Sequence, residues 1–258
     1  MEKQFYDEGM ARQQEKLAAT PDMVAQRQVM LNELRLKEGG RVLEVGSGNG
    51  IFAREMLEVV GESGHVCGID IAEPMVTMAT AMCPRGQFLQ GDATDLPVED
   101  SSFDVVTASQ LLCFVSAVDR ALSEIFRALK PGGRLVILDS DWESLVWNCI
   151  DRSLMDRVFR LITGAYADAH VPRTLSRRLI AAGFQITNRR SFSVLNWEPG
   201  EDTYVKQLMG FVGPMMEASN DFTKDDWEAW SEDQMATAEA GEFMFSVNRY
   251  IFSAVKPQ

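Results

Sequence analysis

The chain has 258 residues, of which 46% are hydrophobic and 24% charged, so it can bury a sizeable core and a disordered chain is excluded. Its formal net charge of −13 repels phosphate backbones and anionic lipid, which excludes nucleic acid and membrane surfaces as preferred partners. The four cysteines form no C-x-x-C pair, and with only two histidines the chain offers no metal-ligand spacing.

No apolar run reaches the ~18 residues of a membrane span, and the polar N-terminal segment lacks the apolar region of a secretory signal. We therefore expect a cytoplasmic protein, either a monomer or a homodimer.

The first 38 residues predict two helices. Residues 3–19 are polar, of mixed charge and helical in pattern. Residues 20–34 form a helical pattern with Thr20 as the N-cap and Pro21 at the first position, where its missing N–H costs nothing.

Short β-branched runs then alternate with helical patterns. Strands are expected at residues 41–45, 65–70, 86–92, 103–109 and 134–140, and helices at residues 50–60, 73–82 and 118–129. This alternation is typical of a parallel sheet with helices on both faces.

The pattern changes after residue 140. Residues 142–167 are predicted to be helical, residues 173–184 form a helix closed by Gly183, and strands are expected at residues 185–195 and 242–257. An acidic insertion rich in Met and Trp, at about residues 196–241, separates these two strands. We interpret it as a helical cover over the edge or mouth of the sheet.

Three glycines connect the first strand of the sheet to the next helix in "RVLEVGSGNGIF", residues 41–52. Such a turn places backbone N–H groups and a helix N-terminus at the carboxyl end of a sheet, where a ligand can approach the backbone. A dinucleotide enzyme would carry the third glycine of its G-x-G-x-x-G pattern at Ile51, which argues against an NAD-dependent oxidoreductase. Glu44 suits a cationic amine better than a pyrophosphate. The same glycines are also compatible with a tight strand–helix turn that binds no ligand.

Two acids follow the next two strands. Asp70 closes the second strand, about twenty residues after the first glycines, where an acid can accept both hydroxyls of a ribose. Asp92 follows the third strand, where its carboxylate can accept from an exocyclic amino group while the N–H of Ala93 donates to a ring nitrogen. Taken alone, Asp70 is also compatible with a solvated or helix-capping acid, and Asp92 with an ordinary turn.

Five motifs in order resemble the class I S-adenosylmethionine-dependent methyltransferases, especially the group of small-molecule enzymes similar to ubiquinone/menaquinone and natural-product methyltransferases. They are E-x-G-x-G-x-G at residues 44–50, GID at 68–70, GDA at 91–93, FDVV at 103–106 and LKPGG at 129–133. The resemblance covers about residues 20–140.

The resemblance implies an α/β, Rossmann-like fold: a seven-stranded, mostly parallel sheet with helices on both faces and an antiparallel last strand, plus the helical cover. We expect a single domain over residues 1–258. Its parts are the N-terminal helices (1–38), a cofactor-binding core (39–140) and a substrate-side half (141–258). The implied function is methyl transfer from S-adenosylmethionine to O, N or C of a small-molecule acceptor, in metabolite biosynthesis. The alternative is a protein of this fold that uses bound S-adenosylmethionine for a non-methylating or structural role.

The resemblance also assigns cofactor contacts. Gly46, Gly48 and Gly50 flank the methionine part, and Glu44 positions that loop or the amine. The further contacts implied are Arg27 with the carboxylate, Asp70 with the ribose, Ile71, Asp92 and Ala93 with the adenine, and Gln110 with the methionine moiety.

Residues after the fourth and fifth strands are candidates for the acceptor side. Many relatives carry a His pair after the fourth strand, whereas this chain has Cys113-Phe114, which removes two candidate bases. Asp141 and His170 are the candidate catalytic residues, with a helix cap and an uninvolved loop histidine as the structural alternatives. The candidate substrate-binding residues are Phe114, Trp142, Tyr166 and Trp197. Aromatic residues near carboxylates suit a flat or cationic molecule.

Overall fold

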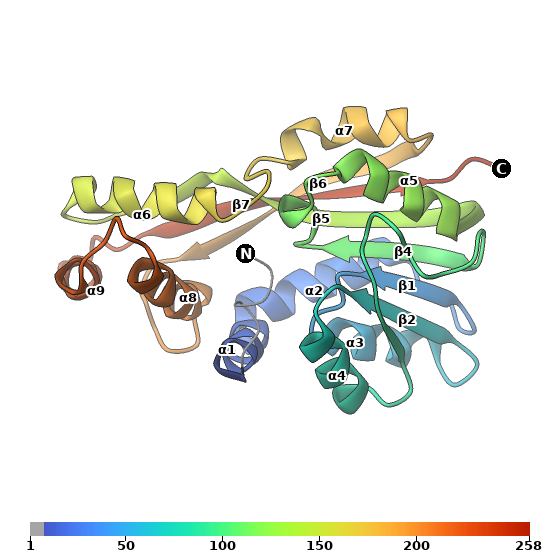
Figure 1. Cartoon of the computed structure of the whole chain (residues 1–258), viewed down its shortest axis with the longest axis horizontal. Coiled ribbons are helices and arrows are strands. Elements are labelled where there is room, and N and C mark those ends of the chain that lie inside the picture. The colour runs from blue at the N-terminus through green and yellow to red at the C-terminus, as the bar shows by residue number, and fades with distance from the viewer. Residues whose placement is uncertain (1–7) are drawn as a thin grey trace.

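The computed structural model describes residues 8–258 (Figure 1). Its strands are β1 (Arg41–Val45), β2 (His65–Asp70), β3 (Gln87–Gln90), β4 (Phe103–Ser109), β5 (Leu129–Trp147), β6 (Gln185–Asn196) and β7 (Phe245–Val255). Its helices are α1 (Glu8–Ala19), α2 (Pro21–Leu34), α3 (Ile51–Val60), α4 (Glu73–Met82), the 3-10 turn η1 (Leu112–Phe114), α5 (Val118–Ala128), α6 (Arg152–Gly164), α7 (Pro172–Ala181), α8 (Tyr204–Ala218) and α9 (Lys224–Glu239). The part of the predicted first helix before residue 8 lies outside the described residues.

The strands form one sheet in the order β3-β2-β1-β4-β5-β7-β6. Strands β1 to β5 pair in parallel, and β7 is antiparallel to both of its neighbours, as predicted. Helices α5 and α7 lie on one face of the sheet, and α2, α3 and α4 lie on the other (Figure 1). The predicted seven-stranded, Rossmann-like fold is confirmed.

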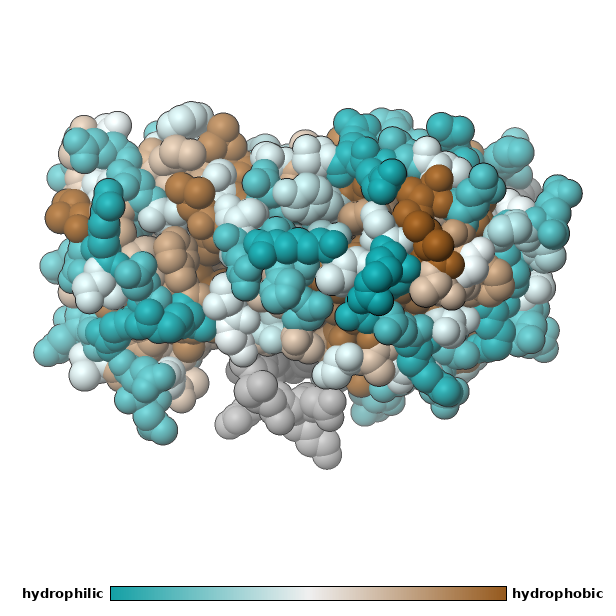
Figure 2. Space-filling model, turned by 90° about the horizontal axis from the view of Figure 1, so that it is seen from above, coloured by the Kyte–Doolittle hydropathy of each residue, from teal (hydrophilic) through white to brown (hydrophobic). Residues whose placement is uncertain are grey.

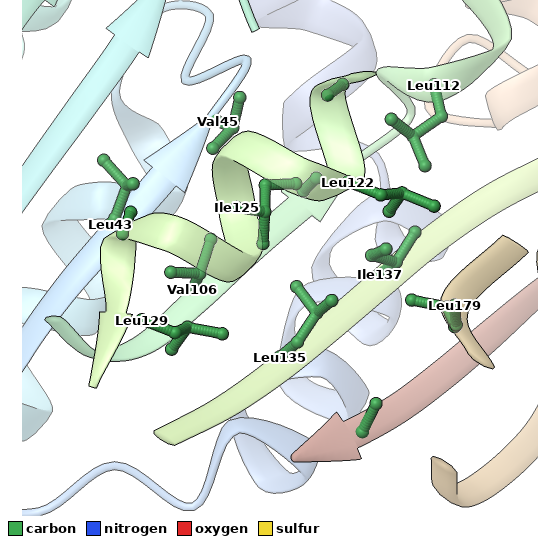
Figure 3. Packing of buried hydrophobic residues seen from close by; sticks show 14 of the residues in the cluster. Leu43, Val45, Val106, Leu112, Leu122, Ile125, Leu129, Leu135, Ile137 and Leu179 are labelled. Atoms are coloured by element: carbon green, nitrogen blue, oxygen red, sulfur yellow. The ribbon is translucent and has the colours of Figure 1, made fainter. Parts of the chain in front are cut away.

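Strand alternation divides the apolar residues between the two faces. Leu43, Val106, Leu135 and Ile137 point toward α5, where Ile125 and its neighbours close the core (Figure 3). The residues between them in the strands, such as Val136, pack instead on the side of α2 and α3. Viewed from the side of α5 and α7, the surface is mostly hydrophilic and its apolar residues form separate patches (Figure 2).

The last three strands extend beyond the rest of the sheet, and α6, α8 and α9 pack on this extension (Figure 1). The prediction of a helix over residues 142–167 is wrong at its start, because β5 continues to Trp147 and α6 begins only at Arg152. The reason is pairing with β7: Trp147 lies opposite Phe245, with ring centroids 4.9 Å apart. This distant strand overrides the local helical pattern.

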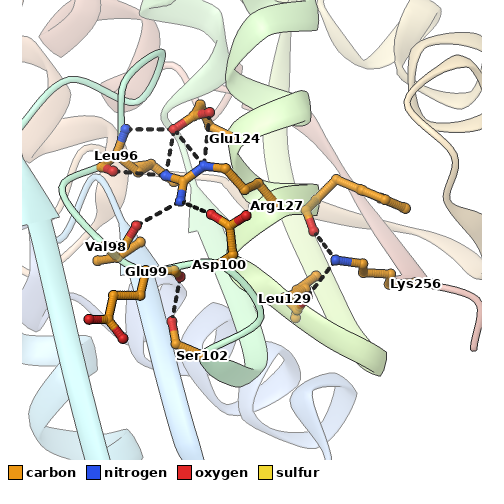
Figure 4. A network of polar contacts seen from close by, with 10 residues as sticks. Leu96, Val98, Glu99, Asp100, Ser102, Glu124, Arg127, Leu129 and Lys256 are labelled. Atoms are coloured by element: carbon orange, nitrogen blue, oxygen red, sulfur yellow. Dashed lines mark hydrogen bonds and ion pairs between the residues drawn. The ribbon is translucent and has the colours of Figure 1, made fainter.

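The segment before β4 is fixed to α5 by an arginine (Figure 4). Arg127 Nη1 donates to Val98 O and Asp100 Oδ1, both at 2.7 Å, and Nη2 donates to Leu96 O at 2.9 Å and to Glu124 Oε2 at 2.7 Å. The Arg127 guanidinium also lowers the pKa of Glu124. Because this segment follows Asp92, the ion pairs anchor the end of the loop that carries the predicted adenine contacts.

Candidate active site

The glycine loop between β1 and α3 has the strained backbone that its sequence predicts. Gly46, Gly48 and Gly50 adopt φ of 76°, 51° and 80°, in the left-handed region that favours glycine. A Cβ on Gly46 would lie 2.9 Å from Leu111, and one on Gly50 would lie 2.9 Å from Ala79. A Cβ on Gly48 would meet nothing within 4 Å, so this glycine faces open space, as a residue beside a ligand must.

Asp70, at the end of β2, ties its own strand to the glycine loop. Its Oδ2 accepts from the amide of Gly48 at 2.9 Å, and its Oδ1 accepts from the amide of Ala72 at 3.0 Å. Burial raises the pKa of Asp70, and these backbone hydrogen bonds oppose the rise. A carboxylate has about four acceptor positions, so lone pairs are left for hydroxyl donors.

Glu44 lies under the loop, near the end of β1, with 3% of its surface exposed. Its Oε2 has no hydrogen-bond partner among the described residues. Burial, followed by the charges of Asp70 and Glu55, raises its pKa well above the ordinary value. An arriving ammonium group would favour the charged carboxylate, so this acid fits a cationic amine.

Arg27, on α2, already has partners in the protein. Its Nε donates to Glu55 Oε1 of α3 at 2.8 Å, and its Nη1 donates to Ala18 O at 2.7 Å. Its side chain is 12% exposed. The structure therefore places Arg27 between helices, with two of its three nitrogens engaged.

The predicted adenine contacts lie at the outer end of the site. Ile71, just after β2, is 55% exposed, which is unusual for a large apolar side chain at a strand end and fits a flat ligand face. Asp92 is exposed, and its Oδ1 accepts from the amide and the hydroxyl of Thr94 at 2.7 and 2.8 Å. Ala93 follows it and is half-buried.

Gln110, directly after β4, connects the end of that strand to the middle of β5. It is one of three non-glycine residues with positive φ among the described residues, at 54°, and its amide donates to Leu138 O. Its side-chain amide lies 2.8 Å from Ser140 Oγ through Nε2, and Ser140 Oγ lies 2.9 Å from Oε1. Left-handed backbone of this kind is frequent at functional sites.

Three of the four aromatic residues that the sequence predicted to bind substrate lie in contact with one another: Phe114, Tyr166 and Trp142. Tyr166 stacks on Trp142, with centroids 4.9 Å apart and planes at 13°, and lies 5.0 Å from the Phe114 ring. Phe114 is 58% exposed, whereas Trp142 is buried. Trp197 does not join them: it follows the end of β6, where Asn196 lies opposite Phe245 at the far end of the extension.

The two predicted catalytic residues lie in a polar cluster on the α7 side. Arg173 holds Asp141 through Nε–Oδ2 and Nη2–Oδ1 contacts of 2.8 and 3.0 Å. Glu143 binds Arg173 at 2.7 Å and lies 3.3 Å from His170 Nδ1. His170 lines a surface hollow of about 740 Å³. Because successive strand side chains point to opposite faces, Asp141 points away from the face of Ser140.

Asp139, in β5 just past the end of its pairing with β4, is fully buried beside η1. Its Oδ2 accepts from the amide of Leu112 at 2.8 Å, while Oδ1 has no partner among the described residues. Burial raises the pKa of Asp139 to about 6. Its contacts assign it a role in holding the turn that presents Phe114.

Arg249 of β7 is a buried charge that the sequence interpretation missed. It is 1% exposed and lies opposite Ser140 of β5. The signal was the alternation of "FSVNRYIFSAV", which puts the arginine on the same buried face as Phe245 and Val247, since a charge at a buried strand position needs a partner.

Within residues 8–258, no helix is both long enough and apolar enough to cross a membrane. The same part of the chain contains no group of three His, Cys, Asp or Glu side chains arranged to hold a metal ion.

Comparison with known proteins finds similarity to methyltransferases. Residues 43–137 match the family model described as a methyltransferase domain. Over 109 residues, 40% of this chain, the sequence is 37% identical to the ubiquinone/menaquinone biosynthesis C-methyltransferase UbiE of Vibrio vulnificus, of which it covers 42%. The chain spans about half or less of the length of the curated relatives it matches.

Solved structures show the same fold. A candidate methyltransferase from Bacillus halodurans has a TM-score of 0.64 at 19% identity, with 91% of this chain and 100% of that chain covered. Phosphoethanolamine N-methyltransferase 2 of Haemonchus contortus, in complex with S-adenosyl-L-methionine, has a TM-score of 0.64 at 21% identity, with 99% of this chain and 59% of that chain covered.

Proposed function

Because the chain carries a class I S-adenosylmethionine-dependent methyltransferase domain, we propose that the protein transfers a methyl group from S-adenosylmethionine to a small-molecule acceptor. The observation that carries the proposal is the glycine loop with its two acids. Gly48 faces open space, Asp70 receives the amide of that glycine, and the buried Glu44 keeps an unpartnered oxygen. This set fits an adenosine that bears a cationic amino acid.

The cofactor supplies a methyl group on a sulfonium, which is already a reactive donor. The protein's part is therefore alignment and exclusion of water. We assign the amino-acid end to Glu44 and the glycine loop, the ribose to Asp70, and the adenine to Ile71 with Asp92 and Ala93. Gln110 borders the methionine end.

The aromatic group of Phe114, Tyr166 and Trp142 supports an acceptor with a flat, apolar part. Phe114 follows the end of β4, Trp142 lies in β5 beyond its pairing with β4, and Tyr166 follows α6, so the rings meet near the carboxyl end of β4, where open α/β sheets bind ligands. We assign the acceptor to this side. A general base is required only where the acceptor atom carries a proton that must leave.

The test is transfer of a labelled methyl group. The purified protein is incubated with S-adenosylmethionine labelled in its methyl group and with a metabolite extract, and labelled small molecules are separated by chromatography. A labelled product that depends on the protein supports the proposal.

Calorimetry with S-adenosylhomocysteine accompanies the assay. Tight binding without any labelled product, over extracts and a panel of O, N and C acceptors, would favour a non-methylating use of the cofactor. A non-methylating use is a real alternative because a fold and its cofactor do not determine the reaction.

A further inference from the structure

Arg249 is a buried cation without an anionic partner. It forms no ion pair within 4.0 Å among the described residues, and its side chain packs over the Tyr204 ring with Cζ 4.7 Å from the centroid. The carboxylate of Asp22, on α2, does not pair with Arg249. It accepts instead from Asn196 Nδ2 and from the backbone amide of Tyr204, the first residue of α8. A buried charge left unpaired is costly, so its position calls for an explanation.

Arg249 uses Nη1 toward α2 and also interacts with the Tyr204 hydroxyl: burial raises the pKa of Tyr204, and the charge and hydrogen bond of Arg249 oppose that rise. Nη1 donates to Gln26 Oε1 and, at 3.0 Å, to Met23 Sδ, both on α2. Nε has no partner among the described residues. Nε and Nη2 form the edge that binds a carboxylate through two parallel hydrogen bonds. Arg173 of this chain binds Asp141 with that same pair of nitrogens.

Arg249 lies one strand away from the residues of the candidate active site. Arg249 lies opposite Ser140, and the side chain of Ser140 contacts Gln110, so the three residues form a row across β7, β5 and β4. Neighbouring strands are about 4.8 Å apart, which puts Arg249 roughly 10 Å from Gln110. An acceptor of one or two rings spans that distance.

The field of Arg249 also reaches the aromatic group. Burial raises the pKa of Tyr166 well above its ordinary value, and the positive charge of Arg249 opposes that rise. The carboxylate of Asp141 does not offset this charge, since Arg173 neutralises it on the opposite face of β5. Of the charges that act on Tyr166, that of Arg249 has a larger effect than that of the buried Asp139, which raises the pKa. A carboxylate therefore suits this side better than the cationic acceptor considered from the sequence.

We propose that Arg249 binds a carboxylate of the acceptor, so that the substrate class is a flat organic acid. The proposal rests on the proposed function. Met23 and Gln26 cover the guanidinium with unbranched, flexible side chains, which can move aside for the ligand.

The test uses benzoate and benzamide, which share a shape and differ in charge. Each is titrated calorimetrically into the full-length protein loaded with S-adenosylhomocysteine. We expect benzoate to bind at least 10-fold more tightly than benzamide. Arg249→Met should remove this preference, and Arg249→Lys should weaken benzoate at least 3-fold with benzamide unchanged. Arg157→Met, on the remote pair with Asp226, is the matched control and should change neither.

Equal affinities of the wild-type protein for the two probes, or no binding of benzoate, overturn the proposal without any variant. So does a folded Arg249→Met protein that keeps its preference, which would assign Arg249 a structural role only. If Arg249→Met does not fold, the proposal is decided by two other results: the relative affinities of the wild-type protein for benzoate and benzamide, and the affinity of Arg249→Lys for benzoate. Failure of S-adenosylhomocysteine to bind overturns the proposed function instead, and the first titration of the loaded protein separates the two results.

Discussion

Asp70 Oδ2 accepts the amide hydrogen of Gly48 at 2.9 Å, so the acid that ends β2 directly holds the loop that follows β1. The two strands are neighbours in the sheet, and the amides of Gly46 and Ser47 both donate to Ile69 O. The acid assigned to the ribose thus also fixes the loop assigned to the methionine. Substitution at this position affects both parts of the proposed cofactor site.

Asp70→Ala is expected to weaken S-adenosylhomocysteine binding at least 10-fold, because it removes the proposed ribose acceptor and releases the Gly48 amide. The matched control is Asp104→Ala, which removes a carboxylate on β4 that accepts from the Arg41 amide and Lys130. It should leave the affinity within about 2-fold. Calorimetry gives both affinities, and unchanged binding by folded Asp70→Ala would remove the ribose assignment.

Gly50→Ala and Gly48→Ala distinguish two reasons for glycine in the same loop: close packing inside the protein at Gly50 and room for a ligand at Gly48. A left-handed alanine costs about 1–2 kcal/mol at either position. At Gly50 the new Cβ would also lie 2.9 Å from Ala79 Cβ and 3.0 Å from its Cα, whereas at Gly48 it meets nothing. We expect Gly50→Ala to lower the free energy of unfolding by about 2–4 kcal/mol, with overpacking added to strain.

Gly48→Ala should cost only the backbone strain in stability but should weaken S-adenosylhomocysteine binding, since its Cβ points into the ligand space. Urea denaturation and calorimetry measure the two effects. Equal stability losses for the two variants would contradict the steric difference seen at Ala79.

Asp139 predicts a pH dependence of stability. Its pKa is raised from 3.8 to about 6 in the folded protein by burial. The folded state therefore binds more protons than the unfolded state between these values, and the contribution to stability is full below pH 3.8 and is lost as the pH rises through 6. At 1.36 kcal/mol per pH unit this amounts to about 3 kcal/mol.

Asp139→Asn keeps an oxygen for the Leu112 amide and removes the titration. Relative to the wild type, its free energy of unfolding should improve progressively from pH 4 to pH 7, by an amount of about 3 kcal/mol. Urea denaturation at a series of pH values gives this difference. Glu44 and Asp70 titrate with the same sign in both proteins, so the difference isolates Asp139; a constant difference would refute the assignment.

The glycine loop and the parallel strands were predictable because their signals are local. Positive φ at Gly46, Gly48 and Gly50 follows from the residue type, and β-branched runs identify buried strands. The same reasoning placed Asp70 and Ile71 at the end of β2. These are properties that a few neighbouring residues determine by themselves.

Features set by distant partners were not predictable in this way. Strand β5 extends to Trp147 because β7, about one hundred residues later, pairs with it. Arg249 meets Gln26, which is 223 residues away in sequence. Asp141 was predicted beside Trp142 in one site, but strand alternation sends its carboxylate to Arg173 on α7. Periodicity alone does not identify such partners.

Arg27→Met tests whether a residue with partners in the protein also serves the cofactor. The substitution leaves Glu55, which is 19% exposed, without its cation and should lower the free energy of unfolding by about 1–3 kcal/mol. The family resemblance assigns Arg27 to the cofactor carboxylate, and Nη2 is the guanidinium nitrogen that its two hydrogen bonds leave over. We therefore expect about 10-fold weaker binding of S-adenosylhomocysteine, with unchanged binding of methylthioadenosine, which lacks the amino-acid end. An equal loss for both ligands, or for neither, would show that Arg27 only joins α2 to α3.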